Sequence, residues 1–259
     1  MMCSANVKRI LTIDQGNSSA KGVLWEGPEI IDTVRMEGSA IEDLLPLLER
    51  GEADGCAYCS VRHTDAKFLE TLRRLVDGRL LVLTASVALP VKVNYGSRST
   101  LGNDRVAAAV GASELCPGEA ALVVDAGTAM TLDVIDEEGN FMGGNIAPGM
   151  RLRFKCLRTE TDQLPLVDCD GPVSVFGHDT VSAIRAGVAG GMACEIADSF
   201  RMAGQMYGCR RIILTGSDGE RLLPLLVQRG LPVEKDVNLV GRGLMRIFNY
   251  NVAREQAFD

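Results

Sequence analysis

Two short segments combine an aspartate, a glycine and small polar residues directly after an apolar run. Asp14-Gln15-Gly16-Asn17 follows residues 7–13, and Asp125-Ala126-Gly127-Thr128 follows residues 121–124. Glycine and small residues let backbone N–H groups approach phosphate oxygens, and an aspartate at a strand end can hold a hydrated divalent cation. The same residue types dominate ordinary hairpin turns. Their occurrence twice in one chain favours phosphate binding over two unrelated turns.

Each segment is expected at the tip of a β-hairpin, because apolar strand patterns flank it on both sides. The predicted strands span residues 7–14, 21–25, 29–36, 54–61, 80–84, two within 121–136, one within 140–149, and 211–215. The predicted helices span residues 41–50, 65–76, 180–207, 220–228 and 237–250, and a further helix follows residue 103. Two copies of the strand-turn-strand unit predict two similar lobes, with a boundary near residues 116–118.

The composition is that of a folded protein of enzyme size. The chain has 259 residues, 46% hydrophobic and 24% charged, and a formal net charge of −7 without a dense Lys/Arg run. This balance disfavours nucleic acid as the main partner. No apolar stretch approaches the length of a membrane span and no apolar segment follows the basic residues near the N-terminus, so we expect a cytoplasmic protein with no membrane partner.

The eight cysteines are scattered, which predicts reduced thiols and no disulfide framework. Cys56 and Cys59 alone are close in sequence, with His63 nearby, and could form a redox couple or half of a metal site. The alternative is that both are small apolar residues of a buried strand. We assign them no function from the sequence.

Four segments, in this order along the chain, resemble the motifs of type III pantothenate kinases, a family within the actin, hexokinase and Hsp70 superfamily. They are Asp14 to Lys21 (DQGNSSAK), Gly102 to Arg105 (GNDR), Asp125 to Thr131 (DAGTAMT) and Gly143 to Gly149 (GGNIAPG). The resemblance implies an α/β fold with two ribonuclease H-like (actin-like ATPase) lobes, each a mixed sheet flanked by helices, and an interlobe cleft. Residues 1–117 would form the lobe with the first phosphate loop and the G-x-D-R element. Residues 118–259 would form the lobe with the second phosphate loop and the adenosine side.

The same resemblance implies ATP-dependent phosphorylation of pantothenate to 4′-phosphopantothenate, the first step of coenzyme A biosynthesis, by a homodimer. Asp104 would be the general base that takes the proton of the substrate hydroxyl. The implied ATP contacts are Asp14, Gln15, Gly16, Asn17, Ser18, Ser19, Ala20, Lys21 and Thr128. The implied pantothenate contacts are Tyr95, Gly102, Asn103, Asp104, Arg105 and Thr180. Asp14 would lie near Mg²⁺, and Asp125 would bind a monovalent cation, K⁺ or NH₄⁺.

Some alternatives stay open at this point. Asp104 and Thr180 also suit the N-cap position of a helix. Ser18 stands where the family usually has Thr, and Thr215-Gly216-Ser217-Asp218 replaces a commoner T-G-G-D, so the adenine contacts are not predicted. His63 and His178 are unassigned. A sugar kinase or polyphosphate phosphatase of the same superfamily, or a non-enzymatic regulatory protein, are the competing functions.

Overall fold

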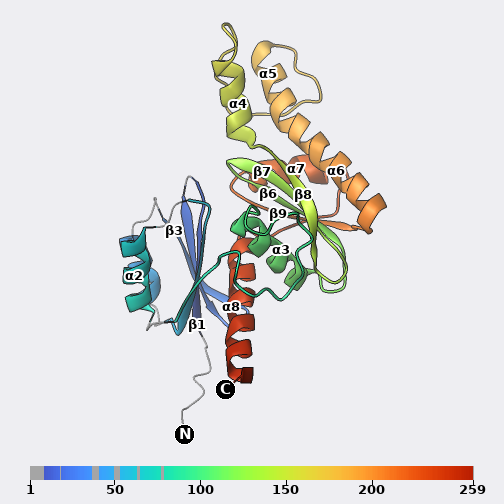
Figure 1. Ribbon diagram of the computed structural model, residues 1–259. Helices are drawn as coiled ribbons and strands as arrows, with labels where there is room; N and C mark the ends of the chain where they lie inside the picture. Colours follow the sequence, from blue (N-terminus) through green and yellow to red (C-terminus); the bar gives the residue numbers. More distant parts are fainter. Residues whose placement is uncertain are drawn as a thin grey trace. The chain divides into compact units, whose positions relative to one another are not determined.

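The computed structural model describes residues 9–17, 19–36, 41–49, 53–62, 65–76 and 79–258 (Figure 1). The chain forms two compact units. The first comprises Met1–Glu114 together with Asn238–Asp259, and the second comprises Leu115–Val237. Among the described residues, no helix is long and apolar enough to cross a membrane.

The first unit is built on a five-stranded mixed sheet in the order β3-β2-β1-β4-β5. Strands β1, β2 and β3 form an antiparallel meander, and β4 and β5 continue the sheet parallel to β1. The strands span Arg9–Gln15 (β1), Ala20–Glu26 (β2), Glu29–Met36 (β3), Gly55–Ser60 (β4) and Leu80–Val82 (β5). Residues 10–13 of β1 are all buried, as expected for a central strand with both faces covered.

Helices cover both faces of this sheet. The turn η1 (Ile41–Leu44) and the helices α1 (Leu45–Glu49) and α2 (Ala66–Leu75) contribute to one apolar core. Helix α8 (Leu239–Phe258) contacts β1, β2 and β4 on the opposite side. A side chain at Gly55 would overlap the ring of Phe248, so this glycine lets α8 lie directly on β4.

Helix α3 (Asn103–Leu115) crosses α8 within the same unit. A Cβ at Gly111 would overlap the carbonyl of Leu239, and a Cβ at Gly243 would overlap the carbonyl of Ala107. The two glycines therefore permit backbone-to-backbone contact between α3 and α8. This crossing fixes α3, whose first turn carries Asp104, against α8.

The second unit repeats the sheet, in the order β10-β9-β6-β7-β8. Its strands span Ala121–Ala126 (β6), Ala129–Ile135 (β7), Phe141–Pro148 (β8), Arg211–Thr215 (β9) and Val233–Lys235 (β10). Again three strands form an antiparallel meander and two continue it in parallel. Position for position, β6 corresponds to β1 and β9 to β4, so the duplication predicted from the sequence is confirmed.

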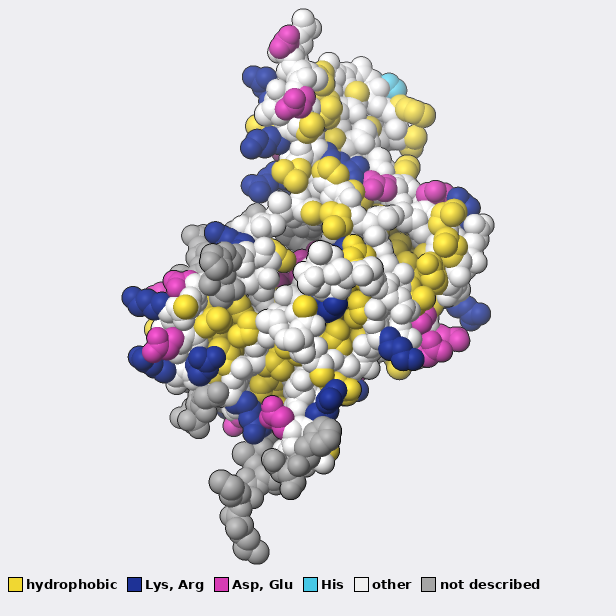
Figure 2. All heavy atoms as spheres, in the orientation of Figure 1, with side chains coloured by type: hydrophobic (Ala, Val, Ile, Leu, Met, Phe, Trp, Pro, Cys, Tyr) yellow, Lys and Arg dark blue, Asp and Glu magenta, His cyan; other side chains and the backbone are white. Residues whose placement is uncertain are grey.

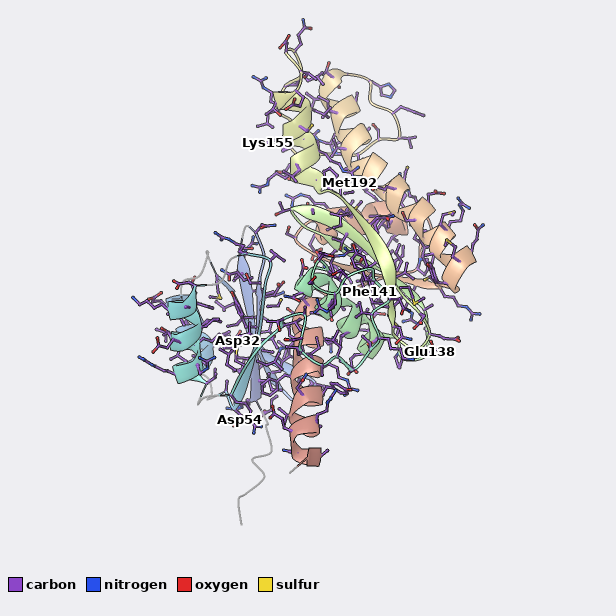
Figure 3. All side chains as sticks on the ribbon, in the orientation of Figure 1. Asp32, Asp54, Glu138, Phe141, Lys155 and Met192 are labelled. Carbon is purple, nitrogen blue, oxygen red and sulfur yellow. The ribbon has the colours of Figure 1, made fainter. Side chains whose placement is uncertain are left out.

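Helices α4 (Met150–Thr159), α5 (Thr180–Arg185), α6 (Gly191–Tyr207) and α7 (Gly219–Val227) accompany this sheet, and the π-helical turn η2 (Ala186–Gly190) joins α5 to α6. Phe141 of β8 and Met192 of α6 are fully buried, whereas Lys155 projects from α4 at the surface (Figure 3). The core of the unit lies between the sheet and α6.

Four features differ from the sequence predictions. The closing helix α8 was expected in a second lobe spanning 118–259 but belongs to the first unit, because Leu244, Ile247 and Phe248 are buried on the side that meets β1 and β4. The helix predicted over 180–207 contains a π-helical turn. Helix α4 and strand β10 were not predicted. Strand β10 has only three residues and α4 is rich in Arg and Lys, so neither carries a strong apolar pattern.

Candidate active site

The first phosphate loop is a tight turn between β1 and β2. The Gly16 N–H donates to the Ser19 carbonyl at 3.0 Å, and a Cβ at Gly16 would lie 3.3 Å from the same oxygen. Asp14 pairs with Lys21 in the β1–β2 register. Ser18, one of the predicted ATP contacts, lies outside the described residues. The turn leaves Asn17 exposed and Lys21 half-buried, close to the strand ends.

Residues of β4 and the residue that follows it, Val61, hold this loop through hydrogen bonds to Gln15. The Tyr58 hydroxyl donates to Gln15 Oε1, and the backbone N–H of Val61 donates to the Gln15 carbonyl at 3.1 Å. Gln15 is only 4% exposed. Its side chain thus stabilises the loop from inside the unit, a role that the sequence motif did not predict.

Asp14 and Asp104 form the acidic centre of the first unit. Burial is the main reason why the pKa of Asp14 rises from 3.8 to about 6. The hydrogen bond from the Cys59 thiol lowers this pKa, the negative charge of Asp104 raises it further, and the positive charge of Lys21 lowers it. The Cys59 thiol donates to Asp14 Oδ1 over 3.4 Å. The acidic centre therefore combines residues from the end of β1, from β4 and from the first turn of α3.

This acidic centre fits a hydrated divalent cation. Carboxylate oxygens are the ligands that Mg²⁺ prefers, and Mg²⁺ in kinases is usually held by one or two carboxylates together with substrate phosphates. Among the described residues no group of three or more His, Cys, Asp or Glu side chains is placed to hold a metal ion. Two carboxylates are within the usual contribution of the protein to a Mg²⁺ ion that is also bound by nucleotide phosphates.

Asp104 lies in the first turn of α3. The first helical bond runs from the Val106 N–H to the Gly102 carbonyl at 3.2 Å, so Gly102, not Asp104, occupies the N-cap position. Asp104 Oδ1 accepts the Arg105 N–H at 2.8 Å, and the side chain stays partly exposed. A Cβ at Gly102 would overlap Asp104 Oδ1. The glycine of G-x-D-R is therefore required for this position of the carboxylate.

Two of the predicted pantothenate contacts, Tyr95 and Arg105, lie together. The Arg105 guanidinium carbon is 5.7 Å from the centre of the Tyr95 ring, within cation–π range. Arg105 is 5% exposed and Tyr95 is 38% exposed. A buried arginine beside a half-exposed aromatic ring offers an anchor for an anionic substrate.

Asn103 has a holding role that the sequence did not reveal. Its Nδ2 donates to the Leu83 carbonyl at 2.9 Å, and its Oδ1 accepts from Arg98 Nη2 at 3.0 Å. Arg98 also donates to the carbonyls of Thr84 and Leu101. These bonds tie the irregular segment after β5 to the start of α3. Nothing in the sequence around Arg98 singled it out.

The second phosphate loop is held by backbone packing. The Gly127 N–H donates to the Ala129 carbonyl at 2.9 Å, and the Gly149 N–H donates to the Thr128 carbonyl at 3.1 Å. A side chain at Gly149 would overlap the Gly127 carbonyl. Gly216, with φ +89°, would place a Cβ 2.5 Å from Asp125 Oδ1 and would overlap the Ala126 carbonyl. Gly149, which follows β8, and Gly216, which follows β9, thus contact the backbone of this loop directly.

A cavity of 630 Å³ adjoins this loop in the second unit. Its wall includes Asp218, whose N–H donates to the Ala126 carbonyl at 2.8 Å and whose pKa is raised by burial. Apolar side chains of α4 and the segment 166–170 make up much of the rest, with a cationic rim. The lining residues are Met150, Arg151, Phe154, Lys155, Arg158, Thr159, Leu166, Val167, Asp168, Cys169, Asp170, Asp218 and Arg221.

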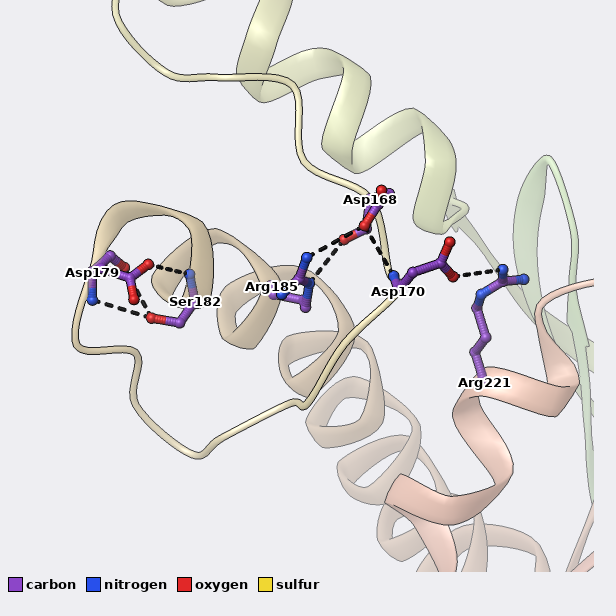
Figure 4. Close-up of polar contacts among 6 residues, drawn as sticks. All are labelled: Asp168, Asp170, Asp179, Ser182, Arg185 and Arg221. Atoms are coloured by element: carbon purple, nitrogen blue, oxygen red, sulfur yellow. Dashed lines mark hydrogen bonds and ion pairs between the residues drawn. The ribbon is translucent and has the colours of Figure 1, made fainter.

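Two ion pairs fix the segment that forms one wall of the cavity (Figure 4). Arg221 of α7 bonds Asp170 at 3.1 Å, and Arg185 of α5 bonds Asp168 at 3.3 Å. Lys and Arg side chains gather along α4 on the visible face (Figure 2), where Arg151, Lys155 and Arg158 follow a helical spacing. The cavity was not predicted, because α4 was not predicted.

Thr180 lies in the second unit, apart in the chain from the other predicted pantothenate contacts. The N-cap of α5 is Asp179 and not Thr180: Asp179 Oδ1 accepts the Ser182 N–H at 2.8 Å, and Ser182 Oγ accepts the Asp179 N–H at 3.1 Å (Figure 4). Thr180 is exposed. The capping alternative for Thr180 is therefore wrong, and its contact with pantothenate stays a prediction.

Comparison with known proteins gives consistent matches over most of the chain. The model of a family described as type III pantothenate kinase matches residues 10–201. A type III pantothenate kinase of Porphyromonas gingivalis is 37% identical over 245 residues, which cover 93% of this chain and 98% of the relative.

Solved structures agree in fold. A protein from Campylobacter jejuni described as a conserved putative Baf family transcriptional activator superposes with a TM-score of 0.60 at 22% identity, over 93% of this chain and 98% of the other. An activator of 2-hydroxyisocaproyl-CoA dehydratase from Clostridium difficile superposes with a TM-score of 0.57 at 11% identity, over 97% and 98% of the two chains. At such identities these similarities establish the fold alone.

Proposed function

Because the chain belongs to the type III pantothenate kinase family, whose members phosphorylate pantothenate in coenzyme A biosynthesis, we propose that Asp104 is the general base of this reaction. The observation that carries the proposal is the acidic centre, where a partly exposed Asp104 at the start of α3 lies near Asp14 at the end of β1. Phosphoryl transfer has a loose transition state, so a carboxylate suffices to orient the hydroxyl and accept its proton late in the reaction.

The first unit supplies the acceptor side of the reaction in this proposal. Asp14 holds Mg²⁺, which when bound would screen the phosphate charge and polarise the transferring group. Lys21, paired with Asp14 in the sheet register, adds a positive charge for the phosphates. Arg105 binds the carboxylate of pantothenate, and Tyr95 packs on its guanidinium. Asp104 then receives the proton of the primary hydroxyl.

The second unit supplies phosphate and nucleoside contacts. The turn residue Thr128 offers its hydroxyl to phosphate oxygens. The cavity beside Asp218 takes the ribose and the base, and its volume falls within the roughly 300–1,000 Å³ of small-molecule sites. Asp125 at the end of β6 is half-buried and offers carboxylate oxygens to K⁺ or NH₄⁺.

A homodimer is part of the proposal, and exposed apolar side chains of the second unit support it. Val175 is 84% exposed and Phe176 is 79% exposed, in the segment leading to α5, and Val181 in the first turn of α5 is also exposed. Apolar groups gathered at a surface mark association sites. Phe176→Asp should convert a dimer to a monomer in light scattering coupled to size-exclusion chromatography, and an unchanged mass would remove this surface from the proposal.

The activity is tested by a coupled ADP-release assay. The purified protein should release ADP only when pantothenate is present, and K⁺ or NH₄⁺ should stimulate the rate over Na⁺. Release that is independent of pantothenate would favour a phosphatase, and release with a sugar alone would favour a sugar kinase. An absence of K⁺ stimulation would remove the role of Asp125 while leaving the reaction in place.

A further inference from the structure

Cys59 contacts the acidic centre directly, although no function was assigned to it from its sequence pattern. It is fully buried on β4, opposite Asp14 in the parallel β1–β4 register. Its sulfur lies 3.4 Å from Asp14 Oδ1, with the thiol as donor. A thiol is a weak donor, but a carboxylate is a strong acceptor, and such charge-assisted bonds are the stronger ones. One oxygen of Asp14 is therefore engaged by the neighbouring strand.

The duplicated fold provides an independent observation. In the second unit, β9 is parallel to β6 as β4 is to β1, and Thr215 pairs with Asp125 in the same way that Cys59 pairs with Asp14. Thr215 is buried, with 3% exposed. Both units thus place a residue with a short donor side chain across from the aspartate of the phosphate loop. A position that serves only to fill the core would have no need of a donor in both copies.

We propose that Cys59 is a positioning residue for the phosphoryl-transfer site: its thiol fixes one oxygen of Asp14 so that the carboxylate presents the other oxygen to the cation that accompanies the nucleotide. This inference rests on the proposed role of Asp14. An unrestrained aspartate samples several side-chain conformers, and holding it in one conformer lowers the cost of binding. Groups that orient metal ligands commonly change metal affinity about 10–100-fold when they are removed.

Cys56 offers a matched control on the same strand. It too is fully buried, but it belongs to the apolar core with Leu11 and Leu72, on the other face of β4 from Cys59. Cys56→Ala and Cys59→Ala each remove one buried thiol from β4. A purely structural contribution should therefore affect both variants similarly, whereas orientation of Asp14 should affect only Cys59→Ala.

The test measures binding without turnover. Mn²⁺ binding is followed by electron paramagnetic resonance of the free ion in the presence of ADP, for the wild-type chain and for Cys56→Ala, Cys59→Ala, Cys59→Ser and Asp14→Asn. We expect Cys59→Ala to weaken Mn²⁺ binding by about tenfold, near the lower limit for such residues because the thiol is a weak donor. Cys59→Ser retains a donor and should recover most of the affinity. Cys56→Ala should match the wild type.

The outcomes separate this inference from the proposed function. Equal Mn²⁺ affinity in Cys59→Ala and the wild type, while Asp14→Asn loses binding, would overturn the role of Cys59 and leave that of Asp14 intact. An equal loss in Cys59→Ala and Cys56→Ala, or a Cys59→Ser variant no better than Cys59→Ala, would also overturn it. Unchanged binding in Asp14→Asn would contradict the assignment of Asp14 itself, and the ADP-release assay decides the activity separately.

Discussion

The two phosphate loops occupy equivalent places in equivalent sheets but are held by different means. In the first unit, side chains of β4 brace the loop: Tyr58 bonds Gln15, and Cys59 bonds Asp14. In the second unit, Gly149 and Gly216 pack their backbones against the loop, with no room for a side chain. The same topology therefore supports two kinds of loop.

The difference matches a division of chemistry between the units. Side-chain bonds position ionisable groups, and the first unit contains the acidic pair Asp14 and Asp104. Backbone packing fixes the path of the second loop, where Thr128 carries the hydroxyl proposed to contact a phosphate. In the proposed reaction, the first unit binds the divalent cation and accepts the proton, and the second unit holds the nucleotide. Each prediction below tests one side of this contrast.

The largest expected effect concerns Asp104, the proposed proton acceptor of the first unit. Asp104→Asn preserves shape and the bond to the Arg105 N–H but removes the base, so kcat should fall by about 10²–10⁴-fold. The melting temperature should stay close to that of the wild type. Asp162→Asn, an exposed residue of the second unit, is the matched control and should keep full activity. Near-normal turnover by Asp104→Asn would remove its catalytic role.

Asp14→Asn should separate activity from stability. The pKa of Asp14 is about 6 in the folded chain against an ordinary 3.8, so the ionised form costs native-state stability above about pH 6. Without divalent cations, Asp14→Asn should therefore raise the melting temperature at neutral pH while abolishing cation-dependent turnover. The gain should shrink as the pH falls from about 6 towards 3.8, because the folded wild type then binds the proton and loses this cost. A gain that does not depend on pH would contradict this account.

Alanine substitutions at loop glycines compare the two kinds of bracing directly. Gly149→Ala must displace the Gly127 carbonyl, so we expect a loss of about 1–3 kcal/mol in the free energy of unfolding. Gly16→Ala meets only the Ser19 carbonyl at 3.3 Å and should cost less. Denaturant titration measures both, with Gly187→Ala, whose Cβ would meet no neighbour, as the control for the substitution itself. Equal losses at positions 149 and 16 would contradict the proposed difference.

The smallest expected effect concerns the rim of the cavity beside Asp218, which is proposed to bind the nucleoside. Arg151 is exposed and lies along the cavity, and its charge, like that of Arg221, partly opposes the rise that burial causes in the pKa of Asp218. Arg151→Ala should raise the KM for ATP by about two- to fivefold, roughly 0.5–1 kcal/mol, with the KM for pantothenate unchanged. Arg73→Ala on α2 removes an exposed arginine of the first unit and should change neither constant. A shift in the KM for pantothenate would place the cavity elsewhere in the reaction.

Much of the fold was predictable because the two hairpins carry clear local signals. In each hairpin, apolar strand residues lie on both sides of a short turn that contains glycine and small polar residues. The presence of two such hairpins predicted two similar sheets. The sequence did not predict that α8 belongs to the first unit. Its contacts with β1 and β4 join residues that are about 200 positions apart, and no local pattern indicates such a contact. Helix α4 was missed because Arg and Lys interrupt its apolar pattern.

The site was predicted unevenly, for a similar reason. The motifs indicated Asp14, Asp104 and Arg105, and the structure brings Asp14 and Asp104 together and packs Arg105 on Tyr95. Residues that act through a neighbouring strand or segment, such as Tyr58, Cys59 and Arg98, have no local signature, since their partners are far away in sequence. Short motifs therefore indicated the candidate reacting groups and missed the residues that hold them in place.

The most direct test is phosphorus NMR of the complete reaction, with ATP, Mg²⁺, K⁺ and pantothenate. A phosphate monoester signal of phosphopantothenate should grow in step with ADP in the wild type, and it should be nearly absent in Asp104→Asn, which still binds ATP. Formation of ADP and inorganic phosphate alone, at a rate indifferent to pantothenate, would contradict the central claim that the acidic centre of the first unit directs the phosphoryl group to this alcohol.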